Sequence, residues 1–341
     1  MNFSKDILNG LIFVSIFAAA ATMIADISYV KDLGISPLVV GIVMGIFYAN
    51  TLHNHVPRAW DAGITFSAKK VLRFAIVFYG FRITFTQIVE VGLDGFLVSL
   101  IMLLTTFILG TYLGIKVFKM DRDTSMLTAS GAAVCGAAAV LATEPVLKAE
   151  EHKTAVAVSM VVLFGTIAMF LYPALYSAGI FEMSDKEFGI YIGATIHEVA
   201  QVVAVASSYS QEVSDDAVIV KMTRVILIAP MLILLGLYLA YEARKKNTTG
   251  EKLKVVIPWF AVYFVIVAGF NSFDLIPHTI VNVINEIDTF LLTVAMTALG
   301  MGTRFAKFKG LGLAPLYTAL SMFIWLLVGG YFITKFIVAY V

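Results

Sequence analysis

Long apolar stretches, separated by short polar ones, run along almost the whole 341-residue chain. Most of them are about 20 residues long, the length that crosses a bilayer as an α-helix. The eleven runs lie near residues 7–28, 36–51, 71–89, 96–118, 126–146, 154–178, 187–208, 217–241, 255–272, 281–303 and 311–338. The pattern predicts an all-α polytopic membrane protein with about eleven transmembrane helices, forming a single membrane domain over residues 1–341.

The composition agrees, because 60% of residues are hydrophobic and 14% are charged, whereas soluble proteins have about 25% charged residues. The first run follows Lys5 and ends in small residues, as a signal peptide would, but its length favours a retained helix. A single cysteine, Cys135, excludes an intramolecular disulfide, and no Cys/His-rich tract indicates a metal or cofactor. A net charge of +1 without a basic patch indicates no nucleic-acid partner.

Lysine and arginine gather in alternate loops between these runs. The second, fourth, eighth and tenth loops are basic, the eighth through residues 244–254, while the third, seventh and ninth have almost none. The positive-inside rule then predicts a multi-pass protein of the inner cell membrane with a cytoplasmic N-terminus and an outside C-terminus. Lys148 and Lys153, in the fifth loop, run against this orientation.

The chain contains a candidate internal repeat. Residues 71–115 and 291–335 align without gaps at an offset of 220, and the shared spacing of their glycines carries the match. The pairs are Gly80 with Gly300, Gly92 with Gly312, and Gly110 with Gly330. The third and tenth runs would cross the membrane in opposite directions, so the segments predict the inverted repeat that many secondary transporters contain.

The segment "SGAAVCGAAAVLATEP", residues 130–145, is too poor in bulky side chains to face lipid. Gly131 and Gly136 would tolerate a helix break, whose free amide groups form a positive dipole end; close helix packing alone is the alternative. The part "GAAVCGAAAVLA" is weakly similar to "GATIHEVAQVVA", which begins at Gly193. Simple counting makes the two segments parallel, so the inverted repeat relates them only if one is re-entrant.

His197 and Glu198 lie about ten residues into an apolar run, close to the bilayer midplane at 1.5 Å per residue. Ionisable groups at that depth are usually functional, and a desolvated glutamate beside an imidazole suits proton transfer. A zinc protease would need a second histidine where Gln201 stands. A purely structural hydrogen-bonded pair is the alternative.

Basic residues also fall inside the runs. Arg82 lies about eleven positions into the third run and requires an anion, either Glu198 or a bound oxyanion. Lys221 and Arg224 are interpreted as lying nearer the interface, where snorkelling explains them, although Arg224 is retained as a candidate.

Smaller polar signals complete the pattern. Gly41 and Gly45 form a GxxxG packing pair, and Asn50 either binds a ligand or caps the helix that they belong to. Asn271 and Ser272, in "GFNSFDLIP", either coordinate a cation or face interfacial water.

The motifs "GISPLVVGIVMGIFYAN", "SGAAVCGAAAV", "GATIHEVAQVVA", "GFNSFDLIP" and "FLLTVAMTALGMGTRF", spread over residues 34–335, resemble the YeiH family, which is labelled a family of sulfate exporters. The resemblance implies a fold of the bile-acid symporter and sodium/proton antiporter type, with panel and core subdomains. It also implies two discontinuous helices that cross near Gly131–Gly136 and Gly193–Gln201. The alanines in "GAAVCGAAAV" stand where related sequences often have serine, which weakens a role for hydroxyls there.

These observations predict a secondary transporter, of exporter type, for a small anion such as sulfate or a sulfonate, coupled to protons or sodium. An anion channel is the alternative, and an intramembrane enzyme ranks third because no nucleophile–base pair can be identified. Membrane lipid is the expected surrounding partner, and a homodimer is left open. The candidate substrate-binding or coupling residues are Asn50, Arg82, Gly131, Cys135, Gly136, Gly193, Thr195, His197, Glu198, Gln201, Arg224, Asn271 and Ser272.

Overall fold

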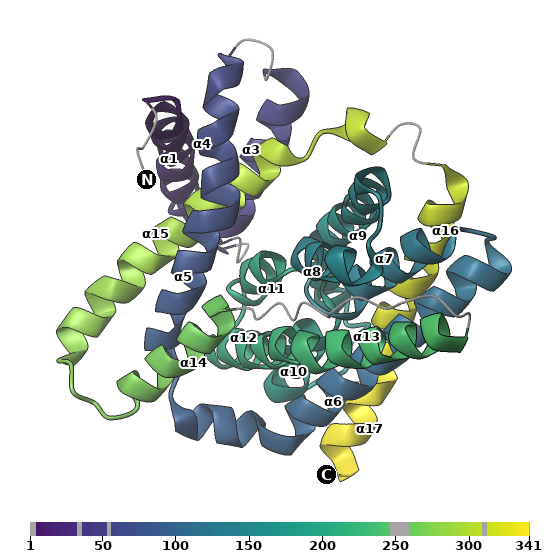
Figure 1. The fold of residues 1–341 in the computed structure, drawn as a ribbon. Coiled ribbons are helices and arrows are strands. Elements are labelled where there is room, and N and C mark those ends of the chain that lie inside the picture. Colours follow the sequence, from purple (N-terminus) through teal and green to yellow (C-terminus); the bar gives the residue numbers. More distant parts are fainter. Residues whose placement is uncertain (1–4, 33–35, 53–55, 246–258, 309–311, 341) are drawn as a thin grey trace. The chain divides into compact units, whose positions relative to one another are not determined.

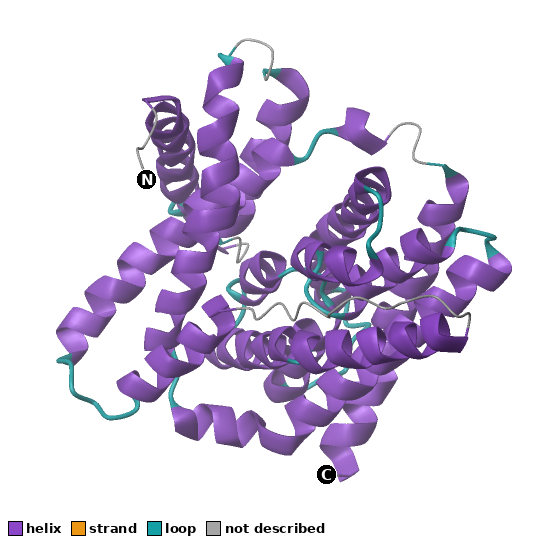
Figure 2. Cartoon of the chain, viewed as in Figure 1, coloured by secondary structure: helices purple, strands orange, loops and turns teal. Residues whose placement is uncertain are grey.

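The computed structural model describes residues 5–32, 36–52, 56–245, 259–308 and 312–340. Within these ranges every regular element is a helix, as the apolar pattern predicts (Figure 2). Six segments are long and apolar enough to cross a membrane, namely Lys5–Ala25, Phe85–Val117, His152–Ser177, Gln211–Glu242, His278–Gly302 and Leu313–Tyr340. Three shorter apolar helices are Pro37–Thr51, Ala137–Leu147 and Trp259–Asn271. Most of the basic eighth loop, residues 246–258, lies outside the described ranges.

The chain divides into two compact units, each assembled from separated stretches. The first unit comprises Met1–Glu90, Val203–Asp215 and Phe260–Lys309, and the second comprises Val91–Val202, Asp216–Trp259 and Gly310–Val341. Their identification with the panel and core subdomains stays a prediction.

The first unit is built around the long helix α15 and the shorter α3, which pack together (Figure 1). Its elements are α1 Lys5–Ala25, α2 Ser28–Asp32, α3 Pro37–Thr51, η2 Arg58–Trp60, α4 Asp61–Phe66, η3 Ser67–Val71, α5 Leu72–Tyr79, η4 Gly80–Arg82, α14 Trp259–Asn271, α15 His278–Gly302 and η6 Phe305–Phe308. A Cβ atom on Gly45 would collide with the Thr297 carbonyl, and one on Gly300 would collide with that of Ile42. The GxxxG pair of α3 therefore packs directly on α15.

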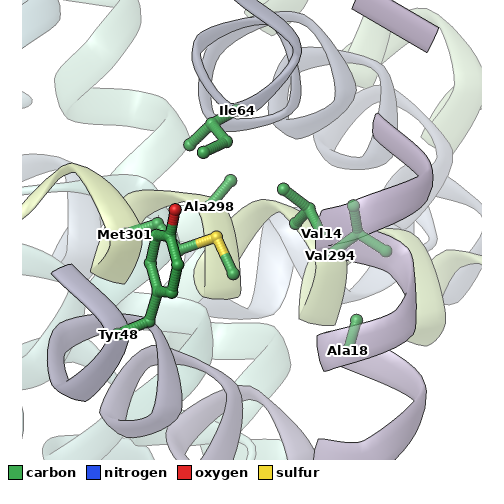
Figure 3. Packing of buried hydrophobic residues seen from close by; sticks show 7 residues of the cluster. All are labelled: Val14, Ala18, Tyr48, Ile64, Val294, Ala298 and Met301. Carbon is green, nitrogen blue, oxygen red and sulfur yellow. The ribbon is translucent and has the colours of Figure 1, made fainter. Parts of the chain in front are cut away.

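Apolar side chains from four helices close the core of this unit. Val14 and Ala18 of α1 and Tyr48 of α3 meet Ile64 of α4, together with Val294, Ala298 and Met301 of α15 (Figure 3). All seven are buried. Ile64 in this cluster holds α4, at the start of the helical run, against α1.

The course of this helical run corrects the predicted position of Arg82. Helical structure is continuous from Asp61 through α4, η3, α5 and η4, and Ile83 is extended, with φ −116° and ψ 144°. Arg82 therefore ends a helical run instead of lying in its middle. The predicted run 71–89 combined the end of this helix with the start of the next, because both are apolar.

The second unit contains two interrupted helices, the first where Gly131 and Gly136 predict a break and the second where the family resemblance implies one. Its elements are α6 Phe85–Tyr112, whose first residues belong to the first unit, η5 Leu113–Val117, α7 Arg122–Ala133, α8 Ala137–Leu147, α9 Glu151–Ser177, α10 Asp185–Thr195, α11 Val199–Ala206, α12 Gln211–Ile226, α13 Ile228–Lys245, α16 Leu313–Ile324, η7 Trp325–Gly329 and α17 Gly330–Tyr340. The ends of α11 and the start of α12 fall in the first unit.

The interruption between α7 and α8 is a sharp bend. A Cβ atom on Gly131 would lie 2.7 Å from a methyl group of Val140, although nine residues of straight helix would separate these positions by about 13 Å. Leu127 and Val140 also share one apolar cluster with Ala157 and Val161 of α9. The run 126–146 is therefore not one straight span, and it has the kind of bend that a re-entrant segment needs.

Contacts between α6 and the α16–α17 segment are reciprocal under the offset of 220. A Cβ on Gly110 would collide with Sδ of Met322, and one on Gly330 would lie 3.5 Å from Cε of Met102. Thr105 and Trp325, which are paired by the same offset, share a hydrogen bond of 3.3 Å. Residues further along α6 contact residues nearer the start of the α16–α17 segment, so the two run antiparallel. An antiparallel pair related by a twofold axis makes such contacts, and they agree with the predicted inverted repeat.

Gly136→Ala is expected to destabilise the protein more than Gly179→Ala. Both glycines have positive φ, 76° and 70°, but a Cβ on Gly136 would collide with Cγ of Glu198 whereas Gly179 has nothing within 4 Å. The φ alone costs about 1–2 kcal/mol, and a strained site without room costs roughly 3 kcal/mol or more. Thermal unfolding in detergent measures the stability lost by each variant. Equal losses for the two variants would contradict the bend assigned at Gly136.

Candidate functional site

Two helix interruptions in the second unit have matching positions. The first spans Val134–Gly136, between α7 and α8, and the second spans residues 196–198, between α10 and α11. The two are separated by 62 residues, the offset that relates "GAAVCGAAAVLA" to "GATIHEVAQVVA". Gly136 makes the first break with φ 76° and ψ −137°, and Ile196 makes the second with an extended ψ of 144°.

Lys221 of α12 joins the two breaks. Its Nζ donates hydrogen bonds to the carbonyl of Val134, at 2.9 Å, and to the carbonyl of Ile196, at 2.6 Å. These two carbonyls are equivalent under the offset of 62. The Lys221 side chain is 0% exposed, so its charge is compensated inside the protein by the ends of α7 and α10.

Arg224 repeats this bonding one helical turn further along α12. Its guanidinium donates to the carbonyls of Ala133 and Ala194, and to that of Ala132 at 3.3 Å. Ala132 and Ala194 are again equivalent under the same offset. Arg224 is also 0% exposed. The interpretation of Lys221 and Arg224 as snorkelling residues is therefore wrong, because α12 turns both side chains towards the two breaks.

The cations lie where an interrupted helix is electrically negative. The last carbonyls of a helix have no partner in the helix and represent about half a negative charge. The ends of α7 and α10 would leave such carbonyls in an apolar interior, where each unsatisfied group costs several kcal/mol in a membrane. Lys221 and Arg224 satisfy both ends together.

Glu198 lies at the opposite, positive kind of helix end. Its Oε1 accepts a hydrogen bond of 3.4 Å from the amide of Ala137, the first residue of α8. The amide of Glu198 itself donates to Oε1 of Gln201 at 3.1 Å. The sequence "HEVAQ" therefore spans the start of α11. Gln201, which stands where a zinc protease would have its second histidine, accepts a hydrogen bond from the backbone.

Two buried polar atoms beside Glu198 have no hydrogen-bond partner among the described residues. They are Nδ1 of His197 and Nε2 of Gln201. His197 is 2% exposed and Gln201 is 0% exposed. The His197 ring stacks near Phe323 of α16, with centroids 6.4 Å apart. Hydrogen-bonding capacity is thus left over at this place, which is rare for buried side chains.

We call Val134–Gly136, residues 196–198, Gln201, Lys221 and Arg224 the break site. Other sequence candidates surround it. Cys135 is a buried free thiol within the first break, and the Thr195 hydroxyl donates within α10 to Tyr191 at 2.6 Å. A Cβ on Gly193 would collide with the carbonyl of Ala217, so this glycine brings α10 close to α12. The structure thus gathers nine of the sequence candidates in the second unit.

The first unit contains a separate polar group around Arg82. Its Nη2 donates to the carbonyl of Asn285, at 2.6 Å, and to Oγ1 of Thr289, at 2.7 Å. The carboxylate of Asp288 lies 3.5 Å away and is fully buried. We call these four residues the Arg82 cluster. The anion that Arg82 requires is therefore Asp288, which the sequence analysis did not select.

A polar cavity of about 420 Å³ adjoins the Arg82 cluster. Its lining includes Arg82, Asn271, Ser272, His278 and Asn285. Asn271 donates to the carbonyl of Ile83 at 3.2 Å, and the Ser272 hydroxyl accepts from the amide of Phe85 at 2.7 Å. Both side chains hold the joint between η4 and α6.

Asn50 makes only structural bonds in the described residues. It donates to the carbonyl of Thr303 at 3.0 Å and accepts from the amide of Phe305 at 2.9 Å. These bonds close the end of α15, so Asn50 links α3 to α15 instead of only capping its own helix.

Comparison with known proteins places this architecture in a family. Residues 9–319 match the family described as "Conserved hypothetical protein 698". A UPF0324 membrane protein of Bacteroides thetaiotaomicron is 47% identical over 335 residues, covering 98% of this chain and 99% of the relative. The chain belongs to the UPF0324 (YeiH) family of membrane proteins.

Two further UPF0324 relatives have the same extent. A membrane protein of Bordetella pertussis is 47% identical over 331 residues, covering 97% of this chain and 95% of the relative. The inner membrane protein YeiH of Escherichia coli K12 is 46% identical over 325 residues, covering 94% and 91%. No solved structure matches the chain. The resemblance read from the motifs is therefore confirmed at the level of the family.

Sequence reasoning on this UPF0324 chain missed Lys221 and Asp288. Lys221 and Arg224 stand three residues apart in the otherwise apolar "AVIVKMTRVILIAP", a spacing that puts both on one helix face. That spacing was the available signal. Asp288 is a carboxylate within the apolar run 281–303. Its signal was the same as that of Glu198, since acids inside membrane helices are rare.

Lys221→Met is expected to destabilise this UPF0324 protein by about 2–4 kcal/mol, because two buried carbonyls would lose their donor at roughly 1–3 kcal/mol each. Lys186→Met is the matched control. That lysine forms a 3.0 Å pair with Asp94 and is 40% exposed, and exposed pairs contribute about 1 kcal/mol at most. Reversible unfolding in mixed micelles gives the free energy of unfolding of each variant. Similar losses for the two variants would mean that Lys221 does not hold the breaks.

A double-mutant cycle tests the Arg82 cluster. Arg82→Gln and Asp288→Asn are each expected to cost roughly 2–4 kcal/mol, since breaking a buried pair costs roughly 3–5 kcal/mol and Arg82 is partly exposed. The double variant should lose less than the sum, because the pair couples the two residues. Unfolding free energies measure the coupling, and additive losses would show that the two side chains act independently.

Proposed function

We propose that this UPF0324 protein is a secondary transporter of a small anion such as sulfate or a sulfonate, with protons as the coupling ion. The observation that carries the proposal is the break site, where Lys221 and Arg224 bridge two interrupted helices. Interrupted helices form the substrate sites of many secondary transporters, because they present unsatisfied backbone groups inside the protein.

The charge of the break site favours an anion. Lys221 and Arg224 contribute two positive side-chain charges, and Glu198 contributes one negative charge when it is ionised. The carbonyl ends of α7 and α10 are balanced by the amide ends of α8 and α11, because each end represents about half a charge. With both cations charged, the sum is positive in either protonation state of Glu198, and an oxyanion would reduce it.

The same geometry favours protons over sodium. A coupling cation in an interrupted-helix transporter binds to carbonyl ends. Here those carbonyls already accept hydrogen bonds from Lys221 and Arg224, and a sodium ion would have to displace a covalently attached cation. A titrating carboxylate, Glu198, lies beside the same helix ends.

The exporter direction and the preference for sulfate come from the resemblance to the YeiH family and belong to the proposal. So do the inner-membrane location with a cytoplasmic N-terminus and an outside C-terminus, the inverted repeat and a homodimeric state. An anion channel is the competing function, and it differs in being uncoupled. We do not propose an enzymatic activity.

Transport by the full chain in proteoliposomes tests the proposal. Uptake of radiolabelled sulfate should saturate with concentration, respond to an imposed pH gradient and ignore a sodium gradient. Glu198→Gln should remove the response to the pH gradient, because the amide keeps the shape of the side chain but cannot titrate. Arg224→Gln should abolish uptake. Lys186→Met, which changes an exposed lysine that is not part of the break site, should transport normally.

Three results would contradict parts of this proposal. A sulfate current without saturation or coupling would identify a channel. Uptake driven by sodium but not by protons would replace the coupling ion. Normal pH-driven uptake by Glu198→Gln would exclude this carboxylate as the proton carrier. The folded state of each variant is checked by its melting temperature and its elution from a size-exclusion column.

A further inference from the structure

The amide end of α8 is already occupied by a carboxylate from the protein itself. The helix has 11 residues and begins directly after Gly136, whose backbone turns the first amides towards Glu198. Oε1 of Glu198 accepts from Ala137 at 3.4 Å. A helix N-terminus is a favourable place for an oxyanion, and in this conformation Glu198 holds that place.

The surroundings of Glu198 contain more donors than its carboxylate uses. Gln201 is fixed beside Glu198 because its Oε1 accepts from the Glu198 amide. The Nε2 atom of the same amide group is buried and has no hydrogen-bond partner among the described residues, and the same is true of Nδ1 of His197. Unpartnered buried polar atoms are unusual. A bound oxyanion would accept a hydrogen bond from the Gln201 amide group, and from His197 in the tautomer that has its proton on Nδ1.

Several charged or titratable groups face Glu198. Lys221 approaches from α12 and Cys135 from the first break, and His197 precedes Glu198 in the chain. Arg224 lies one helical turn beyond Lys221 and is close to Lys221 and Cys135. No second carboxylate appears among these groups. Glu198 is thus the negative charge that an entering anion would meet.

Resting on the proposed function, we propose that Glu198 is a tethered occupant of the anion site at the start of α8, which the substrate replaces only when Glu198 takes up a proton. The carboxylate and the anion compete for the same amide end and the same cations. Two negative charges about 4 Å apart, at an effective dielectric constant of about 20, repel enough to weaken binding on the order of a thousandfold.

Protonation of Glu198 removes that repulsion. The proton comes from water, the carboxylate becomes a neutral carboxyl group, and the two cations remain to hold the anion. One proton is therefore taken up with each anion bound, and it is released when the anion leaves and Glu198 returns to the helix end. Proton coupling arises here from competition for one site, without a separate proton path.

Calorimetric titration of the purified full chain with potassium sulfate tests this scheme. Measurements in two buffers with different heats of ionisation, between pH 5.5 and 8, count the protons taken up. The wild type should take up about one proton per sulfate where Glu198 is ionised, and its affinity should fall up to about tenfold for each rise of one pH unit. Glu198→Gln should take up none and keep a constant affinity.

Two control variants assign the proton. Glu182→Gln changes an exposed carboxylate in the loop between α9 and α10 and should behave as the wild type. His197→Gln should still take up a proton with sulfate. If Glu198→Gln keeps the proton uptake, or if His197→Gln alone loses it, the tethered-occupant scheme is wrong.

The outcome separates this inference from the proposed function. Sulfate binding that is equally strong at every pH in the wild type, without proton uptake, would overturn the inference and leave an anion transporter. If sulfate binds neither the wild type nor Glu198→Gln at any pH, the proposed anion specificity fails and the inference fails with it. If Glu198→Gln does not fold, the number of protons that the wild type takes up per sulfate tests the inference alone. Zero protons would exclude competition between Glu198 and the anion.

Discussion

The bonding of two buried cations to the carbonyl ends of two broken helices is the interaction on which the second unit depends. A membrane interior offers no water to an interrupted backbone. Lys221 and Arg224 donate to five carbonyls of α7, α10 and the adjoining breaks. They allow both helices to stop in the middle of the protein. In turn, the carbonyls compensate two side-chain charges that are buried on one face of α12.

This arrangement separates charge along the helices. Cations lie at the negative ends of α7 and α10, and a carboxylate lies at the positive end of α8. Each charged group occupies the helix end that stabilises it, so the break site keeps ionised groups in an apolar interior. The carbonyl ends are bonded to side chains of the protein, so the proposed anion site is built on the amide ends. That asymmetry distinguishes this site from one built for a metal cation.

The Arg82 cluster in the first unit solves a similar problem differently. There a buried arginine is matched by a carboxylate, Asp288, and by the hydroxyl and carbonyl groups of α15. Its charge is neutralised by a side chain of opposite sign. The break site instead neutralises its cations with backbone dipoles, which leaves the local side-chain charge positive. For this reason an anion site is assigned to the break site and not to Arg82.

The sequence by itself determined the helical membrane architecture and the family, and through the family resemblance it indicated the places of both breaks. Apolar length predicts helices, and the segments Gly131–Gly136 and Gly193–Gln201 combine small residues with polar ones that a continuous helix would not need. Tertiary structure alone decided the partners. Arg82 lies at a helix end because Ile83 is extended, and its partner Asp288 is distant in the chain. Lys221 is buried because α7 and α10 cover its face of α12. Local pattern shows that a charge lies in an apolar run, but whether that charge faces lipid, water or a broken helix depends on which neighbours fold against it.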